Sequence, residues 1–565
     1  MSPADSFVRD RLPPLHQQPQ FLYDLPELAA LKARPQLNLV HELLDRAVSD
    51  KGFADLPLLR SPKITLSYAD VKDRVDRIAQ VLTEDLGLVP GQRVLLRGGN
   101  SIGMALAWLA VVKAGLVAVA TMPLLRSREL VDILDKARPA VALCDARLLD
   151  ELVAAQQLQR SHQEAQSQEP QAPTPDPKPG VKPDLTLLER IVPFNLMNEP
   201  GSLAVLSAQK DGRFDAAPTA ADDIALMAFT SGTTGRAKAV LHSHLDVLAC
   251  CETWPRHVLQ ARSSDIVVGS PPLAFSFGLG GLLIFPMWAG ASVYFPDVPY
   301  TPEVMARLIG EVGATICYTA PTFYRQMAPF IKQHPAPSLR LCVSAGEALP
   351  DATRQLWKAA SGIEMLDGIG GTEMFHIFIS SAGDAVRRGA IGKVVPGYIA
   401  RVVDDAGNTL PPGSVGKLAV IGPSGCRYLD DPRQASYVKD GWNYPGDAFM
   451  QDADGYFFYQ ARADDMIITS GYNVGGPEVE DALLQHPAVA ECGVIGLPDE
   501  ERGMIIKAVV VLKPGFAADA ATVKLLQDHV KASIAPYKYP RAIEFVTSLP
   551  RTETGKLQRF KLRTP

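Results

Sequence analysis

The sequence predicts a multidomain α/β protein in which a large N-terminal part precedes a small α+β part. Three regions of different pattern support this prediction. Up to about residue 390, short apolar runs alternate with helix-length stretches, the pattern of largely parallel sheets flanked by helices. From there to residues 464–465, short strands and turns follow closely and indicate a β-rich subdomain. The remaining residues mix helices and strands, and a length of 565 residues allows several domains.

The first elements are predicted from hydrophobic periodicity. Residues 68–82 are expected to form a helix whose apolar face consists of Val71, Val75, Ile78 and Val81 or Leu82. The most apolar stretch, from Ile102 to Met122, is interpreted as a buried helix followed by a buried strand, because Lys113-Ala-Gly115 interrupts it. It is therefore not expected to span a membrane. Strands buried on both sides are predicted at residues 94–96, 117–119 and 141–143.

One segment, residues 156–183, has an unusual composition. It is rich in Gln and Pro and contains no aromatic residue. Such a sequence cannot build a core, so we expect an extended or disordered surface insertion. A second α/β run is expected after it, with strands at residues 224–229, 266–268, 291–295, 314–318 and 341–344.

The later elements are predicted from turn signals and from short periodic runs. Asp-Gly within residues 452–456, directly before an aromatic run at 456–459, indicates a β-hairpin. The C-terminal part is expected to form a compact α+β unit. Its predicted elements are a helix at 477–486, strands at 490–496 and 505–512, and a helix at 521–534.

Charge and cysteine content exclude several classes of function. Lys and Arg number 56 and Asp and Glu 62, a net charge of −6, so general attraction to nucleic acid or anionic membranes is not expected. The seven cysteines are odd in number and form no CxxC pair, which favours reduced thiols in the cytoplasm over disulfides or structural zinc. The N-terminus has no apolar core of a signal peptide.

The clearest site signal is the run Phe229-Thr-Ser-Gly-Thr-Thr-Gly-Arg-Ala-Lys238. An apolar strand leads into a loop of hydroxyls and glycines that ends in a lysine. Backbone N–H groups in such a loop bind anionic oxygens, and the lysine adds positive charge. The run does not match the Walker loop GxxxxGK[ST]. The predicted anion-binding residues are Thr230, Ser231, Gly232, Thr233, Thr234, Gly235 and Lys238.

With this loop, the sequence resembles the adenylate-forming superfamily of acyl-CoA synthetases, luciferases and peptide-synthetase adenylation domains. Further motifs follow in the expected order over nearly the whole chain. Gly368-Ile-Gly-Gly-Thr-Glu373 is similar to the family's G-Y-G-x-T-E segment, which implies that Thr372 faces the phosphates and Glu373 holds Mg²⁺. The resemblance implies adenine contacts from Asp367, Gly368, Ile369 and Gly370 and from the loop Ala345, Gly346 and Glu347.

Two motifs near residue 450 are similar to the family's ribose and hinge motifs. Tyr444-Pro-Gly-Asp447 resembles Y-x-T-G-D with one position missing, and Asp447 would accept the ribose hydroxyls. Arg462-Ala-Asp464-Asp465 resembles G-R-x-D-D, although Ala461 replaces its glycine. The resemblance implies that Arg462 contacts ribose or phosphate. It also implies that Asp464 is the hinge between an N-terminal adenylation body, residues 1–462, and a mobile C-terminal cap, residues 463–565.

The cap carries the motif Arg551-Thr-Glu-Thr-Gly-Lys556, which matches the family's R-T-x-T-G-K. Lys556 would bridge the substrate carboxylate and the α-phosphate, because an ammonium between two anions lowers the barrier. The resemblance implies two half-reactions, formation of an acyl-adenylate from ATP and its transfer to a thiol such as coenzyme A. Gly471 would line the thiol tunnel in the second state.

The acid is expected to be aromatic. Residues 367–378, DGIGGTEMFHIF, resemble the benzoate–CoA ligase branch, and residues 24–27 and 470–478 resemble 2-aminobenzoate–CoA ligases. Phe375 would help form a short aromatic slot. The residues assigned to the substrate are Phe275, Ser276, Phe277, Gly278, Gly370, His376 and Ile377.

Several alternatives stay open at this stage. Within the superfamily, an aliphatic acyl-CoA synthetase of medium-chain or other type competes with the aryl-CoA ligase, as does an enzyme that loads a separate carrier protein. A non-catalytic nucleotide-binding protein is disfavoured because Glu373 and Lys556 are both present. The predicted partners are small molecules, an aromatic acid, ATP and CoA, and the sequence leaves monomer and homodimer undecided.

Overall fold

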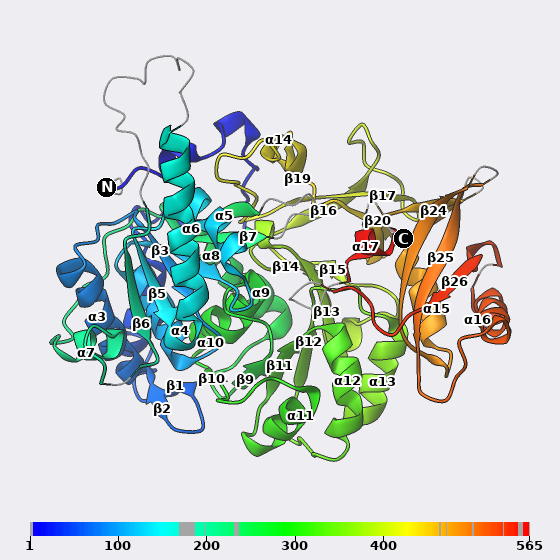
Figure 1. Cartoon of the computed structure of the whole chain (residues 1–565), viewed down its shortest axis with the longest axis horizontal. Coiled ribbons are helices and arrows are strands. Elements are labelled where there is room, and N and C mark those ends of the chain that lie inside the picture. The colour runs from blue at the N-terminus through cyan, green and yellow to red at the C-terminus, as the bar shows by residue number, and fades with distance from the viewer. Residues whose placement is uncertain are drawn as a thin grey trace. The chain divides into compact units, whose positions relative to one another are not determined.

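The computed structural model describes residues 4–168, 187–196, 198–230, 237–462, 465–469, 472–499, 502–534, 536–551 and 557–563. The chain divides into two compact units, and Figure 1 follows it from the N-terminus to the C-terminus by colour. Unit 1 comprises Met1–Pro299, Gly371–His376 and Pro423–Gly441. Unit 2 comprises Tyr300–Gly370, Ile377–Gly422 and Trp442–Pro565.

The larger sheet of unit 1 has the strand order β6-β5-β3-β4-β7-β8. Neighbouring strands run parallel except β7 and β8, which are antiparallel. Every residue of β3 and β5 is buried, as expected for a parallel sheet covered on both faces. The strands are β3 (Arg93–Arg97), β4 (Val117–Thr121), β5 (Val141–Asp145), β6 (Arg190–Phe194), β7 (Ile224–Thr230) and β8 (Lys238–Ser243).

Helices accompany these strands, and α3, α4 and α8 each begin after a capping serine. Helix α3 begins at Tyr68 because the Ser67 hydroxyl accepts from the Asp70 N–H while the Asp70 carboxylate accepts from the Ser67 N–H. The predicted apolar face of this helix is buried. The main helices of unit 1 are α3 (Tyr68–Gln80), α4 (Ile102–Lys113), α5 (Ser127–Ala137), α6 (Leu149–Gln168) and α8 (His244–Cys251).

Unit 1 has a second set of strands, in the order β9-β10-β1-β2, with β1 and β10 parallel. Shorter helices complete the unit. These elements are β1 (Pro57–Arg60), β2 (Thr65–Ser67), β9 (Ile266–Gly269), β10 (Ser292–Tyr294), α1 (Pro26–Lys32), α2 (Arg46–Ser49), α7 (Leu203–Ala208), α9 (Ser276–Leu279), α10 (Phe285–Ala289), α14 (Gln434–Tyr437) and β18 (Val438–Lys439).

Unit 2 begins with parallel strands β11, β12 and β13, to which β14 and β15 are added antiparallel. The strands of this group are β11 (Ile316–Thr319), β12 (Leu341–Ser344), β13 (Met365–Gly370), β14 (Ile377–Ser380) and β15 (Lys393–Val394). Its helices are α11 (Pro302–Glu311), α12 (Pro321–Ile331) and α13 (Asp351–Ser361).

The β-rich part of unit 2 is antiparallel and contains the predicted hairpin. Asp452 Oδ1 accepts from the N–H groups of Asp454 and Tyr456 at 3.0 and 2.8 Å, which closes the turn between β20 and β21. The strands here are β16 (Ile399–Val403), β17 (Val415–Ile421), β19 (Trp442–Asn443), β20 (Asp447–Gln451) and β21 (Phe457–Arg462).

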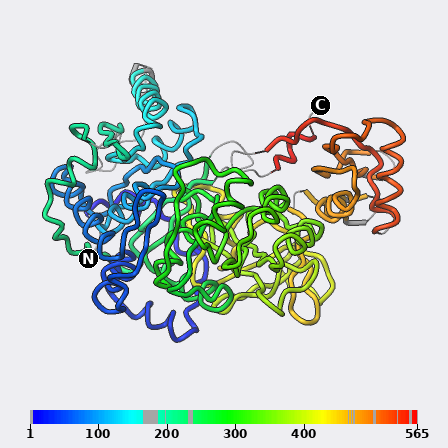
Figure 2. Tube along the Cα trace, turned by 90° about the horizontal axis from the view of Figure 1, so that it is seen from below, coloured from blue at the N-terminus to red at the C-terminus, as the bar shows by residue number. Residues whose placement is uncertain are grey.

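The C-terminal elements of unit 2 gather into one compact body, coloured orange to red in Figure 2. Strand β25 pairs antiparallel with β24 and parallel with β26. The elements are β22 (Ile467–Thr469), β23 (Tyr472–Val474), α15 (Gly476–Leu484), β24 (Val489–Asp499), β25 (Gly503–Leu512), α16 (Ala520–Ser533), β26 (Ala542–Phe545) and α17 (Arg559–Leu562). The helices and strands predicted after residue 476 are confirmed to within a few residues.

One prediction about the first half of the chain is wrong. Residues 156–168 are helical, because α6 continues to Gln168 and the Gln156 amide donates to the Leu188 carbonyl at 2.6 Å. Residues 169–183, the rest of the insertion, lie outside the described residues. The strand expected at residues 224–229 is confirmed as β7, which pairs parallel with β4, whereas β6 (Arg190–Phe194) was not predicted.

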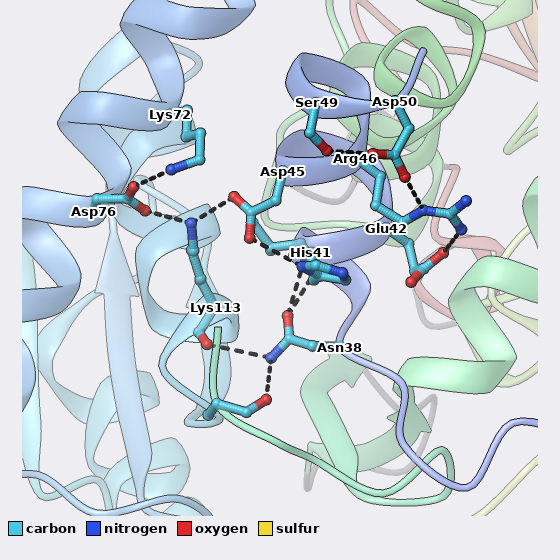
Figure 3. Close-up of polar contacts among 12 residues, drawn as sticks. Asn38, His41, Glu42, Asp45, Arg46, Ser49, Asp50, Lys72, Asp76 and Lys113 are labelled. Atoms are coloured by element: carbon cyan, nitrogen blue, oxygen red, sulfur yellow. Dashed lines mark hydrogen bonds and ion pairs between the residues drawn. The ribbon is translucent and has the colours of Figure 1, made fainter. Parts of the chain in front are cut away.

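A buried ion cluster joins three helical segments of unit 1 (Figure 3). The Lys113 ammonium, at the end of α4, contacts Asp45 Oδ1 at 2.5 Å and also the carboxylate of Asp76 in α3. The second oxygen of Asp76 accepts from Lys72 at 2.6 Å. The side chains of Lys113 and Asp76 are both 0% exposed, so each charge depends on these partners for its solvation.

All seven cysteines are buried, and none of them forms a disulfide. Burial raises the pKa of the Cys144 thiol to about 12 and that of Cys317 to about 12, so these thiols stay protonated. This agrees with the prediction of reduced thiols that pack as small apolar residues. Within the described ranges, no helix combines the length and the apolar character needed to cross a membrane.

Candidate active site

The predicted anion loop is closed by a hairpin in unit 1. Thr230, the last residue of β7, is the register partner of Lys238, the first residue of β8. The two ends of the loop therefore lie next to each other. The residues between them that the sequence assigns to phosphate binding, Ser231, Gly232, Thr233, Thr234 and Gly235, lie outside the described residues.

The segment Gly371–His376, also in unit 1, begins with a 3₁₀ turn over Thr372–Met374. Phe375 follows with φ 67° and ψ −52°, a conformation that L-residues rarely adopt, and the His376 N–H donates to the Met374 carbonyl at 2.9 Å. Such a turn stores strain and persists only where its surroundings fix it.

Two side chains fix this backbone. His242 Nε2 lies 2.6 Å from the Thr372 carbonyl, and the Ser424 hydroxyl donates to the Met374 carbonyl at 2.7 Å. Because a carbonyl only accepts, the His242 Nε2 atom carries a proton. His242 is itself fully buried, so its position is set by the core of unit 1.

The Glu373 carboxylate contacts a tyrosine that also contacts a lysine. The Tyr428 hydroxyl donates a hydrogen bond to Glu373 Oε1 at 2.6 Å, and the Lys238 ammonium lies 3.4 Å from the same hydroxyl oxygen. Burial, and after it the Glu373 carboxylate, raises the pKa of Tyr428, so this hydroxyl stays protonated and acts as a donor. The structure therefore brings together Lys238, Thr372 and Glu373, three predicted catalytic residues.

The predicted acyl segment packs against His376. The His376 ring lies among aromatic rings, with its centroid 5.6 Å from that of Phe277 and 4.6 Å from that of Phe285. Burial lowers the pKa of His376 to about 3, so the imidazole is neutral. Phe375 is fully buried beside Phe285.

Gly278 and Phe275 complete the acyl segment around Ser276. A Cβ atom on Gly278 would lie 2.1 Å from the Pro272 carbonyl oxygen, so no larger residue fits there. Ser276 is buried, whereas Phe275 and Phe277 are half-buried. The segment is thus a close-packed turn whose aromatic rings retain some exposed surface.

The predicted adenine residues belong to unit 2. Strands β12 and β13 are parallel with Ser344 opposite Asp367, so Ala345–Glu347 follow β12 at the same end of the strands where Gly368–Gly370 complete β13. Burial raises the pKa of Asp367 to about 7, although Arg354 and the Gly368 N–H oppose the rise.

Side chains around these strands have definite partners. The Thr322 hydroxyl donates to Glu347 Oε2 at 2.7 Å, and Arg551 lies 3.5 Å from Glu347 Oε1. Ile377, which the sequence assigns to the substrate, is buried beneath Gly368, where a Cβ would lie 2.8 Å from Ile377 Cδ1.

The predicted ribose residues face each other across the β20–β21 hairpin. Asp447 and Arg462 are register partners, and Arg462 Nη1 lies 3.3 Å from Asp447 Oδ1 and 2.8 Å from the Pro445 carbonyl. Gly446 adopts φ 83°, and a Cβ there would lie 2.7 Å from the guanidinium. The shortened Y-P-G-D motif thus forms a tight turn that only glycine fits well.

Three predicted residues, Asp464, Gly471 and Lys556, lie outside the described residues. The segment that contains Lys556 begins and ends at residues that pair with each other, since Arg551 and Leu557 form an antiparallel bridge.

Sequence reasoning missed His242 and Tyr428. For His242 a signal existed: residues i and i+4 of a strand share a face, and His242 is four positions after Lys238. Tyr428 carried no comparable signal, since its contact joins residues 55 positions apart.

Comparison with known proteins gives one consistent result. The profile of the AMP-binding enzymes matches residues 45–427, and that of the AMP-binding enzyme C-terminal domain matches residues 478–556. The benzoate–CoA ligase of Thauera aromatica is 37% identical over 503 residues, which cover 88% of this chain and 90% of that protein.

Solved structures resemble the chain over nearly its whole length. The anthranilate CoA ligase AuaEII in complex with anthranoyl-AMP matches with a TM-score of 0.84 and 34% identity, over 94% of this chain and 98% of the other. A benzoate CoA ligase from Burkholderia xenovorans LB400 matches with a TM-score of 0.79 and 29% identity, over 93% and 99%.

Proposed function

Because the chain belongs to the family of AMP-binding enzymes, we propose that it is an aryl-CoA ligase. It activates an aromatic carboxylic acid of the benzoate or 2-aminobenzoate type with ATP, forms AMP, and transfers the acyl group to coenzyme A. The observation that carries this proposal is that one short segment, Gly371–His376, holds both the residue assigned to the metal and a residue assigned to the aromatic acid. Glu373 shares the Tyr428 hydroxyl with Lys238, and His376 lies among aromatic rings.

In the first half-reaction a carboxylate oxygen of the acid attacks the α-phosphorus of ATP. The bond from the α-phosphorus to the bridging oxygen breaks, and pyrophosphate leaves. Acid and triphosphate are both anionic, so donors and cations must offset their repulsion. We assign the β- and γ-phosphates to residues 230–235 and Lys238, and we assign to Lys556 the place between the carboxylate and the α-phosphate.

Glu373 suits a magnesium ion that is bound together with the triphosphate. Such ions use one or two protein carboxylates and complete their octahedron with substrate phosphates and water. Glu373 supplies one carboxylate close to Lys238, and the described residues contain no group of three or more His, Cys, Asp or Glu that could hold a metal without substrate. When bound, Mg²⁺ neutralises phosphate charge; Glu373 would hold it and Thr372 would face the phosphates.

In the second half-reaction the sulfur of the CoA thiol attacks the acyl carbonyl, the C–O bond of the acyl–phosphate mixed anhydride breaks, AMP leaves, and the thiol proton passes to solvent. We propose that residues 463–565 act as a cap that turns about Asp464 against the body of residues 1–462. This turn withdraws Lys556 and brings Gly471 to the thiol path. Asp447, with Arg462 beside it, is assigned to the ribose hydroxyls, and the loop Ala345–Glu347 with Gly368–Gly370 to the adenine.

Asp367 is assigned to the adenine amino group, and this makes ATP binding depend on pH. Its pKa is raised to about 7 by burial, so the carboxylate form, which accepts from an amino group, is lost as the pH falls through 7. We expect KM for ATP to rise about five- to tenfold from pH 8 to pH 6, the loss of one charge-assisted hydrogen bond. In Asp367→Asn, KM for ATP should no longer change between pH 8 and pH 6. An Asn variant whose KM depends on pH as in the wild type would refute the assignment.

The aromatic assignment is tested with a panel of acids. Purified protein is given ATP, Mg²⁺ and CoA with benzoate, 2-aminobenzoate or octanoate, and AMP and the CoA thioester are measured. We expect kcat/KM for the better aromatic acid to exceed that for octanoate by at least about 100-fold, because a short aromatic slot excludes a long chain. A preference for octanoate would instead support an aliphatic acyl-CoA synthetase.

The same reactions separate the remaining alternatives. AMP and thioester formed in equal amounts with free CoA support the ligase. Acyl-adenylate formed without thioester would point to an enzyme that loads a carrier protein, and binding of ATP without either product would leave only a nucleotide-binding role.

We also propose that the ligase works in the cytoplasm. Support comes from the seven buried cysteines, which form no disulfide and so need no oxidising compartment. Fractionation of cells, with markers for each compartment, checks this: recovery in an oxidising compartment would contradict it.

A further inference from the structure

One face of strand β8 is directed at the segment that carries Glu373. Every second residue of a strand lies on the same face, and on β8 these residues are Lys238, Val240 and His242. His242 contacts the Thr372 carbonyl, and Lys238 contacts Tyr428. No part of the proposed function assigns a role to Tyr428.

Tyr428 is held at this face by strand pairing. It bridges to Val240, and the flanking bonds run from the Leu241 N–H to the Arg427 carbonyl at 2.8 Å and from the Leu429 N–H to the Ala239 carbonyl at 2.9 Å. Its own N–H donates to the Gln434 side-chain oxygen at 2.9 Å. The tyrosine is fully buried, so its hydroxyl has a fixed direction.

The Tyr428 hydroxyl is the middle of a chain of hydrogen bonds. It receives from the Lys238 ammonium at 3.4 Å and donates to Glu373 Oε1 at 2.6 Å. Such chains polarise and strengthen their members, and a hydrogen bond to a carboxylate is stronger than one between neutral groups. One oxygen of Glu373 is thereby occupied, and the other is left for a further ligand.

We propose that Tyr428 is a positioning residue for Glu373: its hydroxyl fixes the carboxylate so that the second oxygen, Oε2, meets a divalent cation bound with ATP. This inference rests on the metal role of Glu373 in the proposed function. Mg²⁺ demands near-ideal octahedral geometry, so it gains more from a fixed ligand than a more tolerant cation does.

The hydroxyl is not needed to hold the backbone of the segment. His242 and Ser424 bind the carbonyls on either side of Glu373, and the tyrosine ring keeps its packing when only the oxygen is removed. Tyr428→Phe therefore releases the carboxylate and leaves the 3₁₀ turn in place.

The test measures how much a cation strengthens ATP binding without turnover. Calorimetry gives the Kd for ATP with excess Mg²⁺, with excess Mn²⁺ and with EDTA, in the absence of acid and CoA. The gain from Mg²⁺ is the Kd for ATP in EDTA divided by the Kd with Mg²⁺. For Y428F we expect this ratio to be about tenfold smaller than in the parent protein, because one hydrogen bond to a charged group is lost. Binding in EDTA should be unchanged, and Mn²⁺ should restore part of the gain.

Two further variants make the outcome decisive. Tyr68→Phe is the matched control, because Tyr68 is another fully buried tyrosine of unit 1 whose hydroxyl donates to the Ala291 carbonyl at 3.0 Å. It should keep the full gain from Mg²⁺. Glu373→Gln should lose the gain, and adding Y428F to it should change nothing more, since a positioning residue acts only through its partner.

Each result has a separate meaning. If E373Q loses the gain from Mg²⁺ and Y428F keeps it, the role of Tyr428 is refuted and the proposed function stands. If both variants keep the gain, the metal role of Glu373 fails and this inference fails with it. If Y428F does not fold, the Glu373→Asp variant, which is too short to reach the hydroxyl, replaces it: an unchanged gain from Mg²⁺ would then refute the proposal.

Discussion

Replacing Lys556 by alanine is expected to slow acyl-adenylate formation about 10²- to 10³-fold, the cost of removing one preorganised group at the site where charge develops. The ammonium is assigned to the space between a carboxylate and the α-phosphate, two anions that must approach each other. No other lysine in the motif Arg551–Lys556 could take its place. The second half-reaction does not need this group, because the carboxylate and the α-phosphate are by then joined in a mixed anhydride and no longer approach each other as two anions.

The two half-reactions are measured separately. ATP–pyrophosphate exchange reports the first, and formation of benzoyl-CoA from supplied benzoyl-adenylate and CoA reports the second. Lys561→Ala is the matched control, an exposed lysine in the same C-terminal segment that should leave both rates unchanged. An equal loss in both half-reactions, or none in either, would contradict the role assigned to Lys556.

Replacing Lys113 by methionine is expected to lower the free energy of unfolding by about 3–5 kcal/mol, the cost of breaking a buried ion pair by removing one partner. Lys113 is the shared partner of Asp45 and Asp76 (Figure 3). Without it Asp45 loses its lysine and Asp76 keeps only Lys72, whose side chain is 33% exposed. Denaturant titration, followed by tryptophan fluorescence, measures the loss.

The Lys113→Met variant should also respond to pH. Burial already raises the pKa of Asp76 although Lys113 and Lys72 oppose it, and loss of Lys113 removes the stronger opposition. A carboxyl whose folded pKa lies above its unfolded value binds a proton more tightly when folded, so stability rises as the pH falls. The difference in free energy of unfolding between the variant and the parent should therefore become smaller toward acid pH.

Two variants serve as controls for this cluster. Lys72→Met removes a half-exposed partner and should cost about 1 kcal/mol or less. Asp76→Asn added to Lys113→Met should recover part of the loss, because it removes the stranded charge. A Lys113→Met protein as stable as the parent at neutral pH would show that the cluster does not hold the three segments together.

Local patterns were enough to predict most elements. The helix at Tyr68–Gln80 follows from its apolar periodicity, and the strand at Arg93–Arg97 follows from a short apolar run. The helical part of the insertion, residues 156–168, could not be predicted this way. Its Gln-rich sequence has no clear apolar face, and its position depends on contacts such as that of Gln156 with the Leu188 carbonyl.

Long-range pairing limited the prediction of the sheets and of the site. The partner of β7 is β4, a choice that no local pattern encodes. The Thr230–Lys238 loop and Glu373 were visible as motifs, whereas Tyr428 reaches Glu373 only through its pairing with β8. Motifs identify groups that touch ligands; the residues that position those groups depend on the fold.

The most direct test of the aryl-CoA ligase is ATP–pyrophosphate exchange with the intact chain, Mg²⁺ and benzoate or 2-aminobenzoate. We expect label from pyrophosphate to enter ATP only when the aromatic acid is present, with AMP and the aryl-CoA thioester formed in equal amounts once CoA is added. Formation of ADP instead of AMP, or exchange that occurs with octanoate and not with either aromatic acid, would contradict the account.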